Sequence, residues 1–443
     1  MDTVMSERIG FNTLPPTLMH VDLNSCFATI EQQANPLLRG KPVAVAAYTT
    51  PGGCILAASY EAKRFGVKTG LRVREGKMVC PGLIILPSDP WKYRWVNRKL
   101  LALFSVYTAT VEVKSIDEMV LDFERSPALE RHVGPMPYEN VLVESTMQTI
   151  AKEIKRKIKE EVGEWLTVSV GIAPNRYLAK VAAGLHKPDG LDVISKVNIE
   201  TILESLSLED LCGIKAGYGG RLRRWGIGTA LAFYKANIRT LKSAFHSING
   251  YYWWLRLHGW EADDREFAKK SVGHSYALYE PYRRSDPRLS QILCQLTEKM
   301  GRRLRSYGAR ASGMHVWCLL GGYASWHHGE SLGSPIYSNK DLYDAAQRIL
   351  KTAPNELVRN IAVSCFCLTF DLYTQLTLDE SEVKKEERTR AIDAIHDRWG
   401  GGLVTSARLL KTPQRIKDRI AFGGVKDLEE FIFQDKIRGE YTD

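Results

Sequence analysis

Short apolar runs alternate with helix-like stretches over the first 194 residues. Strands are predicted where apolar residues are continuous or alternate with polar ones, at residues 17–23, 42–48, 54–58, 110–114, 119–123 and 166–172. Helical spacing of apolar residues predicts helices after a cap at Ser25, at 60–66, 91–104 and 140–160, and from Pro174 onward. We expect these elements to surround one sheet.

The pattern changes after residue 194. Residues 195–262 are predicted to be helical, and the charged residues 261–270 follow them. From Ser271 a strand is predicted. It is followed by a helix at 286–306, two strands within 309–334, a helix at 339–354 and a strand at 361–371. This order is typical of a small α+β domain. The remainder is charged and predicted to be mostly helical, with an exposed stretch at 380–390.

The composition is that of a globular protein with a basic surplus. The chain has 443 residues, and domains average about 100–200 residues, so two to four domains are expected. Lys and Arg total 61 against 51 for Asp and Glu, which gives a net charge of +10. Such a surplus favours a polyanionic partner, most commonly nucleic acid, although many basic enzymes have no such partner.

The cysteines and the apolar runs indicate the setting of the protein. None of the eight cysteines forms a C-x-x-C pair, so buried free thiols are favoured over zinc sites or disulfides. Cys365 and Cys367 are expected on one face of a strand. No pattern of a signal peptide and no apolar run of about 18 residues is present. We expect a cytoplasmic protein that does not bind a membrane.

Three acidic residues suggest metal chemistry. Asp22 ends an apolar strand, where a carboxylate is costly unless it is paired or holds a metal ion. Asp117 and Glu118 are adjacent between two predicted strands. Carboxylate oxygens suit Mg²⁺, and phosphoryl transfer with two metal ions needs such a cluster. For an isolated Asp-Glu pair, ordinary acids at a strand end are the commoner explanation, so the surrounding sequence decides.

Four segments occur around these acids in a fixed order. They are Val-Asp-Leu-Asn-Ser-Cys-Phe at 21–27, Tyr-Glu-Ala-Lys-Arg-Phe-Gly-Val at 60–67, Ser-Ile-Asp-Glu at 115–118, and Ser-Val-Gly-Ile-Ala-Pro-Asn-Arg-Tyr-Leu-Ala-Lys at 169–180 with Lys-Pro-Asp-Gly at 187–190. Together they resemble the motifs of Y-family DNA polymerases. The resemblance is strongest over residues 17–195, continues more loosely to about 420, and is closest to the DNA polymerase IV branch.

The resemblance implies an α+β multidomain protein with the right-hand polymerase fold. The palm would occupy residues 1–26 together with 88–194, and the fingers would occupy residues 27–87. A helical thumb with a helix-hairpin-helix-like segment would span 195–262, and a linker 263–270. An α+β little finger would span 271–378, before a charged helical C-terminal region at 379–443.

The resemblance also implies the roles of the metal site and of the nucleotide site. Asp22, Asp117 and Glu118 would be catalytic and would hold two Mg²⁺ ions, for which Mn²⁺ can substitute, with the backbone carbonyl of Leu23 as a further ligand. Phe27 would be the steric gate against a ribose 2′-hydroxyl; the alternative is a core residue on the first helical turn. The residues matched to the incoming nucleotide are Tyr60, Lys63 and Lys187, with Arg64 as the alternative to Lys63.

Other positions are expected to contact DNA. Asn175, Arg176 and Lys180 would help packing or bind the DNA backbone. Lys215 and Arg221 belong to a segment that resembles a phosphate-binding helix-hairpin-helix, although an ordinary turn fits equally well. The basic residues of the small domain, which include Arg302 and Arg305, suit phosphate contacts. Residues 375–378, from Gln375 to Leu378, resemble a sliding-clamp docking peptide, and an exposed strand end is the alternative.

These features predict a monomeric DNA polymerase that adds deoxynucleotides to a primer on a template strand. Low-fidelity translesion synthesis without proofreading is expected, near the nucleoid if the source is bacterial. One alternative is a catalytically inactive scaffold of a mutasome, but the three acids and Phe27 argue against it. The other is a palm-fold nucleotide cyclase, which would leave the regions that resemble a thumb and a little finger unexplained.

Overall fold

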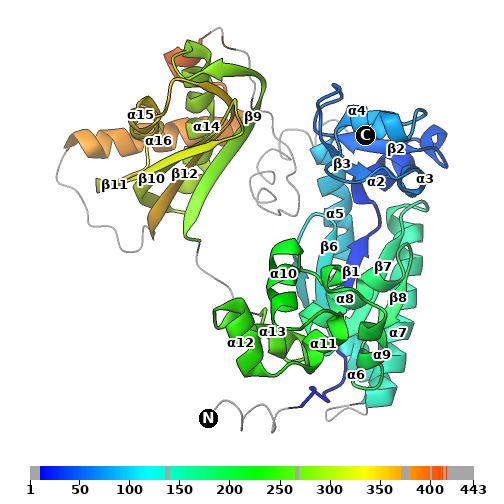
Figure 1. Ribbon diagram of the computed structural model, residues 1–443. Helices are drawn as coiled ribbons and strands as arrows, with labels where there is room; N and C mark the ends of the chain where they lie inside the picture. Colours follow the sequence, from blue (N-terminus) through cyan, green and yellow to red (C-terminus); the bar gives the residue numbers. More distant parts are fainter. Residues whose placement is uncertain are drawn as a thin grey trace. The chain divides into compact units, whose positions relative to one another are not determined.

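The structure is a computed structural model that describes residues 10–134, 140–264, 269–370, 380–399, 402–410, 412 and 416 of the 443-residue chain. Contacts between Cα atoms divide the chain near residue 265 into two compact units (Figure 1). Among the described residues, no helix combines the length and the apolar character that crossing a bilayer requires.

The first unit is built around a five-stranded sheet with β1 (Leu18–Leu23) at its centre. Its order is β5-β6-β1-β7-β8, and the other strands are β5 (Thr110–Val113), β6 (Glu118–Asp122), β7 (Val168–Ala173) and β8 (Leu191–Val193). β1 is antiparallel to β6 and to β7. The strands predicted at 17–23, 110–114, 119–123 and 166–172 are therefore confirmed, with small shifts at their ends.

Helices cover both faces of this sheet, which explains why β1 and β7 are almost fully buried. Met19, Val21 and Leu23 pack in one core with apolar residues of α5 (Pro90–Phe104) and α7 (Asn140–Lys157). α8 (Arg176–Leu185) packs on the other face, against β1 and β7 (Figure 1). Because side chains alternate along a strand, His20 and Asp22 belong to the face that α8 covers.

A glycine allows α8 to lie close to the sheet. A Cβ atom added to Gly171 of β7 would lie 2.0 Å from the carbonyl oxygen of Ala179 and 2.2 Å from the backbone nitrogen of Ala183. Any larger residue would push the helix outward. Gly171 therefore sets the distance between α8 and the strand that pairs with β1.

The strands predicted at 42–48 and 54–58 form a separate sheet, so the expectation of one sheet is wrong. β2 (Val43–Ala46) pairs with β3 (Ile55–Ala58) and, in parallel, with β4 (Ile84–Pro87). α3 (Tyr60–Arg64) and α4 (Val73–Val79) connect β3 to β4. Ala44, Ile55 and Val73 belong to a small core of this part. Neither β4 nor α4 was predicted.

One predicted helix start is confirmed and another is displaced. α2 (Cys26–Ala34) begins after Ser25, but Ser25 has a left-handed backbone (φ 52°) and its side chain makes no capping hydrogen bond. α8 starts two residues after Pro174, because the Asn175 side chain caps it by accepting a hydrogen bond from the Leu178 N–H at 2.8 Å. Ser25 therefore occupies the predicted N-cap position without forming a side-chain cap, whereas Pro174 does not open α8 as predicted.

The rest of the first unit is helical, as predicted for 195–262. Its helices are α9 (Ile199–Glu204), α10 (Ala216–Arg224), α11 (Ala230–Lys235), α12 (Ile238–Phe245) and α13 (Asn249–Leu257), in addition to α6 (Pro127–Val133) earlier in the chain. Phe233, Phe245 and Trp253 lie side by side in a core that also includes apolar residues of α8. This shared core joins the helical region to the sheet.

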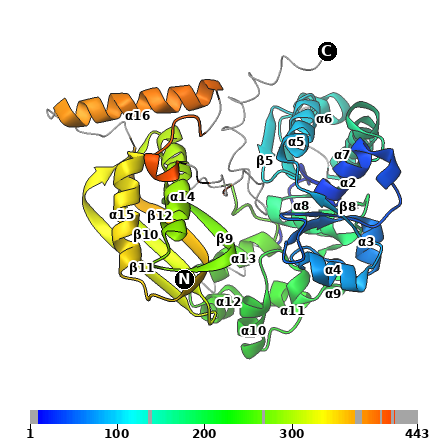
Figure 2. The same ribbon diagram turned by 90° about the horizontal axis from the view of Figure 1, so that it is seen from above.

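The second unit contains a four-stranded antiparallel sheet of order β11-β10-β12-β9. Its elements follow the predicted sequence: β9 (Ser271–Arg283), α14 (Pro287–Ser306), β10 (Ala309–Leu320), β11 (Ser325–Ile336), α15 (Asn339–Lys351) and β12 (Leu357–Phe370). Met314, Val316 and Cys318 are buried in the core shared with α14 and α15. α16 (Glu380–Trp399) lies beside α14 (Figure 2).

All eight cysteines are free thiols. Cys365 is buried and Cys367 is exposed, so the prediction that both lie on one face is wrong. The reason is local, because Cys367 has a positive φ of 53° that interrupts the alternation of the strand.

Candidate active site

Two carboxylates face each other across neighbouring strands. Asp22 of β1 is the register partner of Glu118, the first residue of β6. Their side chains are 14% and 19% exposed, so both are largely withdrawn from solvent. The Leu23 N–H donates to the Asp117 carbonyl at 2.8 Å, which fixes the acidic turn to the end of β1. The three predicted acids are thus carried by one end of the sheet.

Burial gives these acids unusual proton affinities. It raises the pKa of Asp22 to about 6, and the neighbouring charges of Asp117 and Glu118 add to the rise. Burial also raises the pKa of Asp117, against a hydrogen bond of 2.5 Å donated by the Ser115 hydroxyl. Burial alone would raise the pKa of Glu118 as well, but the hydrogen bond from Lys180 and the charges of Lys180 and Lys187 together outweigh it, and the pKa is lowered.

Two lysines compensate the carboxylates. Lys187, which follows α8, donates from Nζ to Asp22 Oδ2 at 2.5 Å, and Lys180 of α8 donates to Glu118 Oε2 at 2.6 Å. Lys180 therefore lies at the acids, on the face of the five-stranded sheet that α8 covers. Positive charge is favoured here because each buried carboxylate is costly without it.

The residues expected to bind a nucleotide lie around Ser25. Lys63 Nζ donates to the Ser25 hydroxyl at 2.7 Å and lies 4.4 Å from the centre of the Tyr60 ring. Burial lowers the pKa of Lys63, and the nearby Lys187 charge contributes. Arg64 is exposed on the same helix. Of the two adjacent cations, Lys63 is the one that reaches the end of β1.

Phe27 lies on the first turn of α2 and belongs to the core of the five-stranded sheet. Its ring stacks on that of Tyr93, with the ring centres 4.3 Å apart and the planes at 16°. Only 9% of Phe27 is exposed. A core position and a gate position are compatible for this residue, because the ring can have one buried face and one edge at the site.

His20 joins the acids although it was not predicted. One ring nitrogen of His20 and one carboxylate oxygen each of Asp22 and Glu118 lie within 4.8 Å of one another. Within the described part of the chain, neither ring nitrogen has a hydrogen-bond partner. Burial lowers the pKa of His20 to about 4, so the ring is neutral near pH 7. Its place two residues before Asp22 in a strand is the signal that could have revealed it.

Asn24 is a second residue that was not assigned a role. It is buried, donates to the Ser169 hydroxyl at 2.9 Å, and accepts from the Asp189 N–H at 2.8 Å. These bonds tie the end of β1 to β7 and to the loop that carries Lys187. Asn24 thus helps to place the lysine that pairs with Asp22.

The donor set fits a divalent cation. Hard carboxylate oxygens are the ligands that Mg²⁺ prefers, and Asp22 and Glu118 bring theirs within 4.8 Å of each other. The raised pKa of Asp22 indicates a site where the anionic form lacks sufficient compensation. A bound cation would supply it, as the two lysine ammonium groups partly do.

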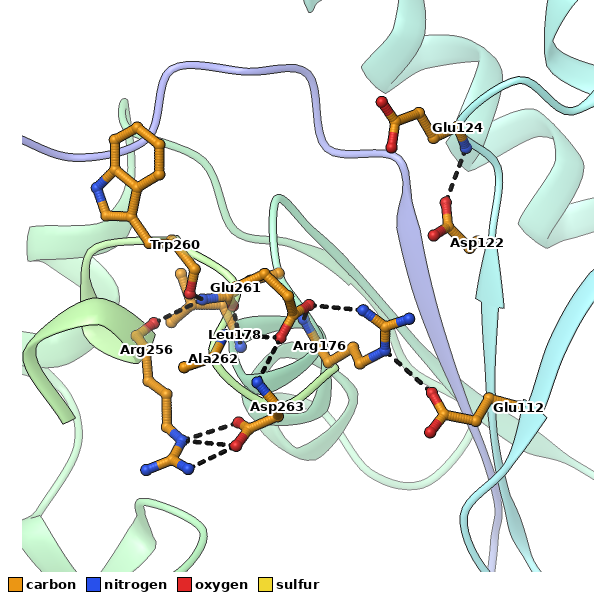
Figure 3. Close-up of polar contacts among 12 residues, drawn as sticks. Glu112, Asp122, Glu124, Arg176, Leu178, Arg256, Trp260, Glu261, Ala262 and Asp263 are labelled. Carbon is orange, nitrogen blue, oxygen red and sulfur yellow. Dashed lines mark hydrogen bonds and ion pairs between the residues drawn. The ribbon is translucent and has the colours of Figure 1, made fainter. Parts of the chain in front are cut away.

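Arg176 and Asn175 serve packing within the first unit. Arg176 donates to Glu112 at 3.0 Å and to Glu261 at 2.8 Å (Figure 3). The Asn175 amide donates to the carbonyl oxygens of Arg256 and Trp260. A bidentate pair between the Arg256 guanidinium and the Asp263 carboxylate continues the network. The network fastens residues 260–263, the end of the described first unit, to β5 and to the start of α8.

The other positions expected at DNA lie in different settings. Lys215 and Arg221 are exposed, before and on α10. Arg302 and Arg305 of α14 donate to Asp397 and Asp393 of α16, at 2.9 and 2.5 Å. The clamp-like segment at 375–378 lies outside the described residues.

Comparison with known proteins gives a consistent result. Residues 21–184 match the impB/mucB/samB family, and residues 269–378 match the C-terminal domain of that family. A DNA polymerase IV of Halalkalibacterium halodurans is 30% identical over 403 residues, which cover 88% of this chain and 92% of that protein. A DNA polymerase IV of Bacillus subtilis is 28% identical over 418 residues, 91% of this chain and 97% of that protein.

Solved structures show the same fold. The "Y-family DNA polymerase chimera Dbh-Dpo4(243-245)-Dbh" superposes with a TM-score of 0.67 at 24% identity, over 80% of this chain and 99% of that one. The "Insertion ternary complex of Dbh DNA polymerase" gives a TM-score of 0.52 with the same coverage.

Proposed function

The chain belongs to the impB/mucB/samB family and is a DNA-directed DNA polymerase of the Y family, similar to DNA polymerase IV, and we propose that it copies template strands past damaged bases. Synthesis would be of low fidelity and without proofreading. The substrates would be primer-template DNA and deoxynucleoside triphosphates. The observation that carries the proposal is the cross-strand pairing of Asp22 with Glu118, next to the turn that holds Asp117.

The acids would hold two Mg²⁺ ions, for which Mn²⁺ can substitute. Asp22, Asp117 and Glu118 would be the side-chain ligands and Leu23 would add its carbonyl oxygen. When bound, the ions supply positive charge at the attacking primer oxygen and at the triphosphate. Support comes from the donor chemistry and from the raised pKa of Asp22, which a cation would relieve.

The lysines would bind the incoming triphosphate. Lys187 and Lys63 carry compact charges suited to phosphate, and both lie at the end of β1 near Tyr60. In this structure Lys187 pairs with Asp22. Nucleotide binding would exchange that carboxylate for a phosphate. Arg64 would contribute less than Lys63, because it does not reach Ser25 in this structure.

Phe27 would exclude ribonucleotides. A rigid ring next to the sugar overlaps with a 2′-hydroxyl oxygen and leaves room for hydrogen alone. The support is its position on the first turn of α2, four residues after Leu23, with its ring held against Tyr93.

DNA would be held mainly by exposed cations. Lys215 and Arg221 near α10 are available for phosphate contacts, whereas Lys180, Arg302 and Arg305 must first leave a carboxylate partner. We further propose the domain limits given above and action as a monomer. Residues Gln375 to Leu378 would dock on a sliding clamp.

Primer extension tests the proposal. With Mg²⁺ and each deoxynucleotide, the parent protein should extend a primer as the template directs, and Asp117→Ala should not. Asp122→Ala is the control, because Asp122 lies at the other end of β6 (Figure 3). Extension by Asp117→Ala would refute the metal assignment. A parent protein that binds DNA without extending it would favour the inactive scaffold.

A further inference from the structure

The position of the Phe27 ring depends on a tyrosine from another helix. Tyr93 of α5 stacks on Phe27 at 4.3 Å with the planes almost parallel. Tyr93 is completely buried, whereas Phe27 has a small exposed part. One face of Phe27 therefore rests on Tyr93, and a shift of Tyr93 would shift the ring that is proposed to face the sugar.

Tyr93 is in turn fixed by a buried carboxylate. Its hydroxyl donates to Glu31 Oε1 at 2.9 Å, and the second oxygen of Glu31 accepts from Lys92 Nζ at 2.6 Å. Glu31 is 8% exposed. Burial raises the pKa of the Tyr93 phenol above its usual range, so Tyr93 stays protonated and remains a donor.

Tyr93 contacts α2 at two residues, Phe27 and Glu31. Glu31 follows Phe27 by four residues on α2, so the two side chains lie on one face of the helix. α5 then supplies the ring that touches Phe27 and, through the same residue, the hydroxyl that touches Glu31. Stacking sets the distance between the two ring planes, and the hydrogen bond to Glu31 adds a second, directional point of attachment for the Tyr93 ring.

We propose that Glu31, acting through Tyr93, is a positioning residue that holds the Phe27 ring where it discriminates between deoxyribose and ribose. The inference rests on the proposed role of Phe27 as the steric gate. Excluding a single oxygen requires the ring to be held to within about 0.5 Å. A Phe27 ring that can retreat from the site would admit the 2′-hydroxyl.

The simpler explanation is that the Tyr93–Glu31 bond only fastens α2 to α5. The same core contains a matched pair that separates the two explanations. The Tyr107 hydroxyl donates to Glu153 Oε1, also at 2.9 Å, and Tyr107 is 7% exposed. The Glu153 side chain is 43% exposed against 10% for that of Glu31, so loss of this bond should cost less stability, and it does not touch Phe27.

The experiment measures single-nucleotide incorporation of deoxynucleotides and ribonucleotides and compares the ratio of their kcat/KM values. Tyr93→Phe removes the donor and Glu31→Ala removes the acceptor. Each should lower the ratio roughly 10-fold, since a small misplacement of a positioning group has effects of this order. Glu31→Gln keeps an acceptor oxygen and should restore most of the selectivity. Tyr107→Phe should leave the ratio at the parent value.

A double-mutant cycle tests whether the effect passes through Phe27. Phe27→Ala should lower the ratio further than Tyr93→Phe, and adding Tyr93→Phe to Phe27→Ala should change nothing more. An undiminished effect of Tyr93→Phe without the Phe27 ring would overturn the inference. So would an unchanged ratio in both Tyr93→Phe and Glu31→Ala, or an equal loss in Tyr107→Phe.

The failure of the gate itself has a different signature. If Phe27→Ala leaves the ratio unchanged, the proposed role of Phe27 is wrong and the inference falls with it. If Phe27→Ala lowers the ratio while Tyr93→Phe and Glu31→Ala do not, the gate stands and only its positioning by Glu31 is refuted. The thermal unfolding temperature of each variant shows whether the variant is folded under the conditions of the kinetic assay.

Discussion

Residues that are proposed to bind the nucleotide near the end of β1 have protein partners in this structure. Lys187 shows this most clearly, because its ammonium group rests on Asp22 Oδ2 at 2.5 Å. The pair lowers the cost of burying Asp22. It also holds the lysine close to the position proposed for the phosphates.

Lys187→Ala should therefore weaken nucleotide use rather than DNA binding. A charge-assisted hydrogen bond contributes about 1.5–3 kcal/mol, so the KM for the incoming nucleotide should rise roughly 10- to 100-fold. Steady-state kinetics on a primer-template measure this change. Lys159→Ala is the control. The Lys159 ammonium group pairs at 3.5 Å with Asp189, which belongs to the loop that carries Lys187, and not with Asp22. A KM equal to that of the control would contradict the role of Lys187.

The sequence revealed those site residues that belong to short continuous motifs. Asp22, Lys63 and Lys187 could be named because each is surrounded by a recognisable segment. Tyr93 and Glu31 could not, since they are 62 positions apart and only the folded chain brings them together. Ordinary residue types at ordinary helical positions give no signal of such a contact.

At the scale of elements, the site depends on how closely α8 approaches the sheet. α8 carries Lys180, which binds Glu118, and Gly171 permits the approach. Strand predictions from apolar patterns succeeded for four strands of the five-stranded sheet, including the buried β1 and β7, but missed β8, which has only three residues. They failed for β4, because Ile84–Pro87 is short and only partly buried. The pairing of β2 with β4 depends on an intervening crossover that no local pattern encodes.

Two glycines of this region should respond in opposite ways to substitution by alanine. Gly171→Ala places a methyl group 2.0 Å from a backbone oxygen of α8, and such overpacking costs about 1–3 kcal/mol. Gly184→Ala, on α8 itself, meets nothing within 4 Å and should gain up to about 1 kcal/mol of helix propensity. Denaturant unfolding measures both changes.

The polymerase activities of the two glycine variants should differ in the same way as their stabilities. Gly171→Ala should slow incorporation because α8 and Lys180 move away from Glu118, whereas Gly184→Ala should not. Equal stability of the two variants would show that α8 can shift without cost, which would contradict the close packing described here.

The whole molecule consists of two units with separate cores. One core set surrounds the five-stranded sheet and the helices that follow it, and the other lies between the four-stranded sheet and α14 and α15. The sequence placed the change of pattern at the charged residues 261–270, and the division near residue 265 falls within them. The acid pair Glu261 and Asp263, however, is bound into the first unit.

Separate cores should unfold separately. We expect two transitions in calorimetry, because cooperative two-state unfolding is a property of single domains. Lowering the pH from 6.5 to 5 should shift the transition of the first unit. Burial lowers the pKa of His258 in that unit to about 4 from an ordinary value of 6.5. Its contribution to stability is therefore complete above pH 6.5 and is lost as the pH falls toward 4.

The loss should be on the order of 2 kcal/mol by pH 5. His258→Phe keeps an aromatic ring against Trp254 and should remove this part of the pH dependence. His20 of the same unit also has a pKa lowered to about 4 and keeps its own share of the pH dependence. A single transition, or a pH shift as large in His258→Phe as in the parent protein, would contradict the prediction.

The pairing of Asp22 with Glu118 also restricts how the length of such a chain can change in evolution. Side chains alternate along a strand, so the gain or loss of one codon within β1 or β6 would turn one carboxylate to the opposite face. Changes of two residues would keep the face but move the carboxylate along the strand. Insertions and deletions should therefore accumulate in the connections, such as the turn between β2 and β3, while the lengths of the two central strands stay fixed.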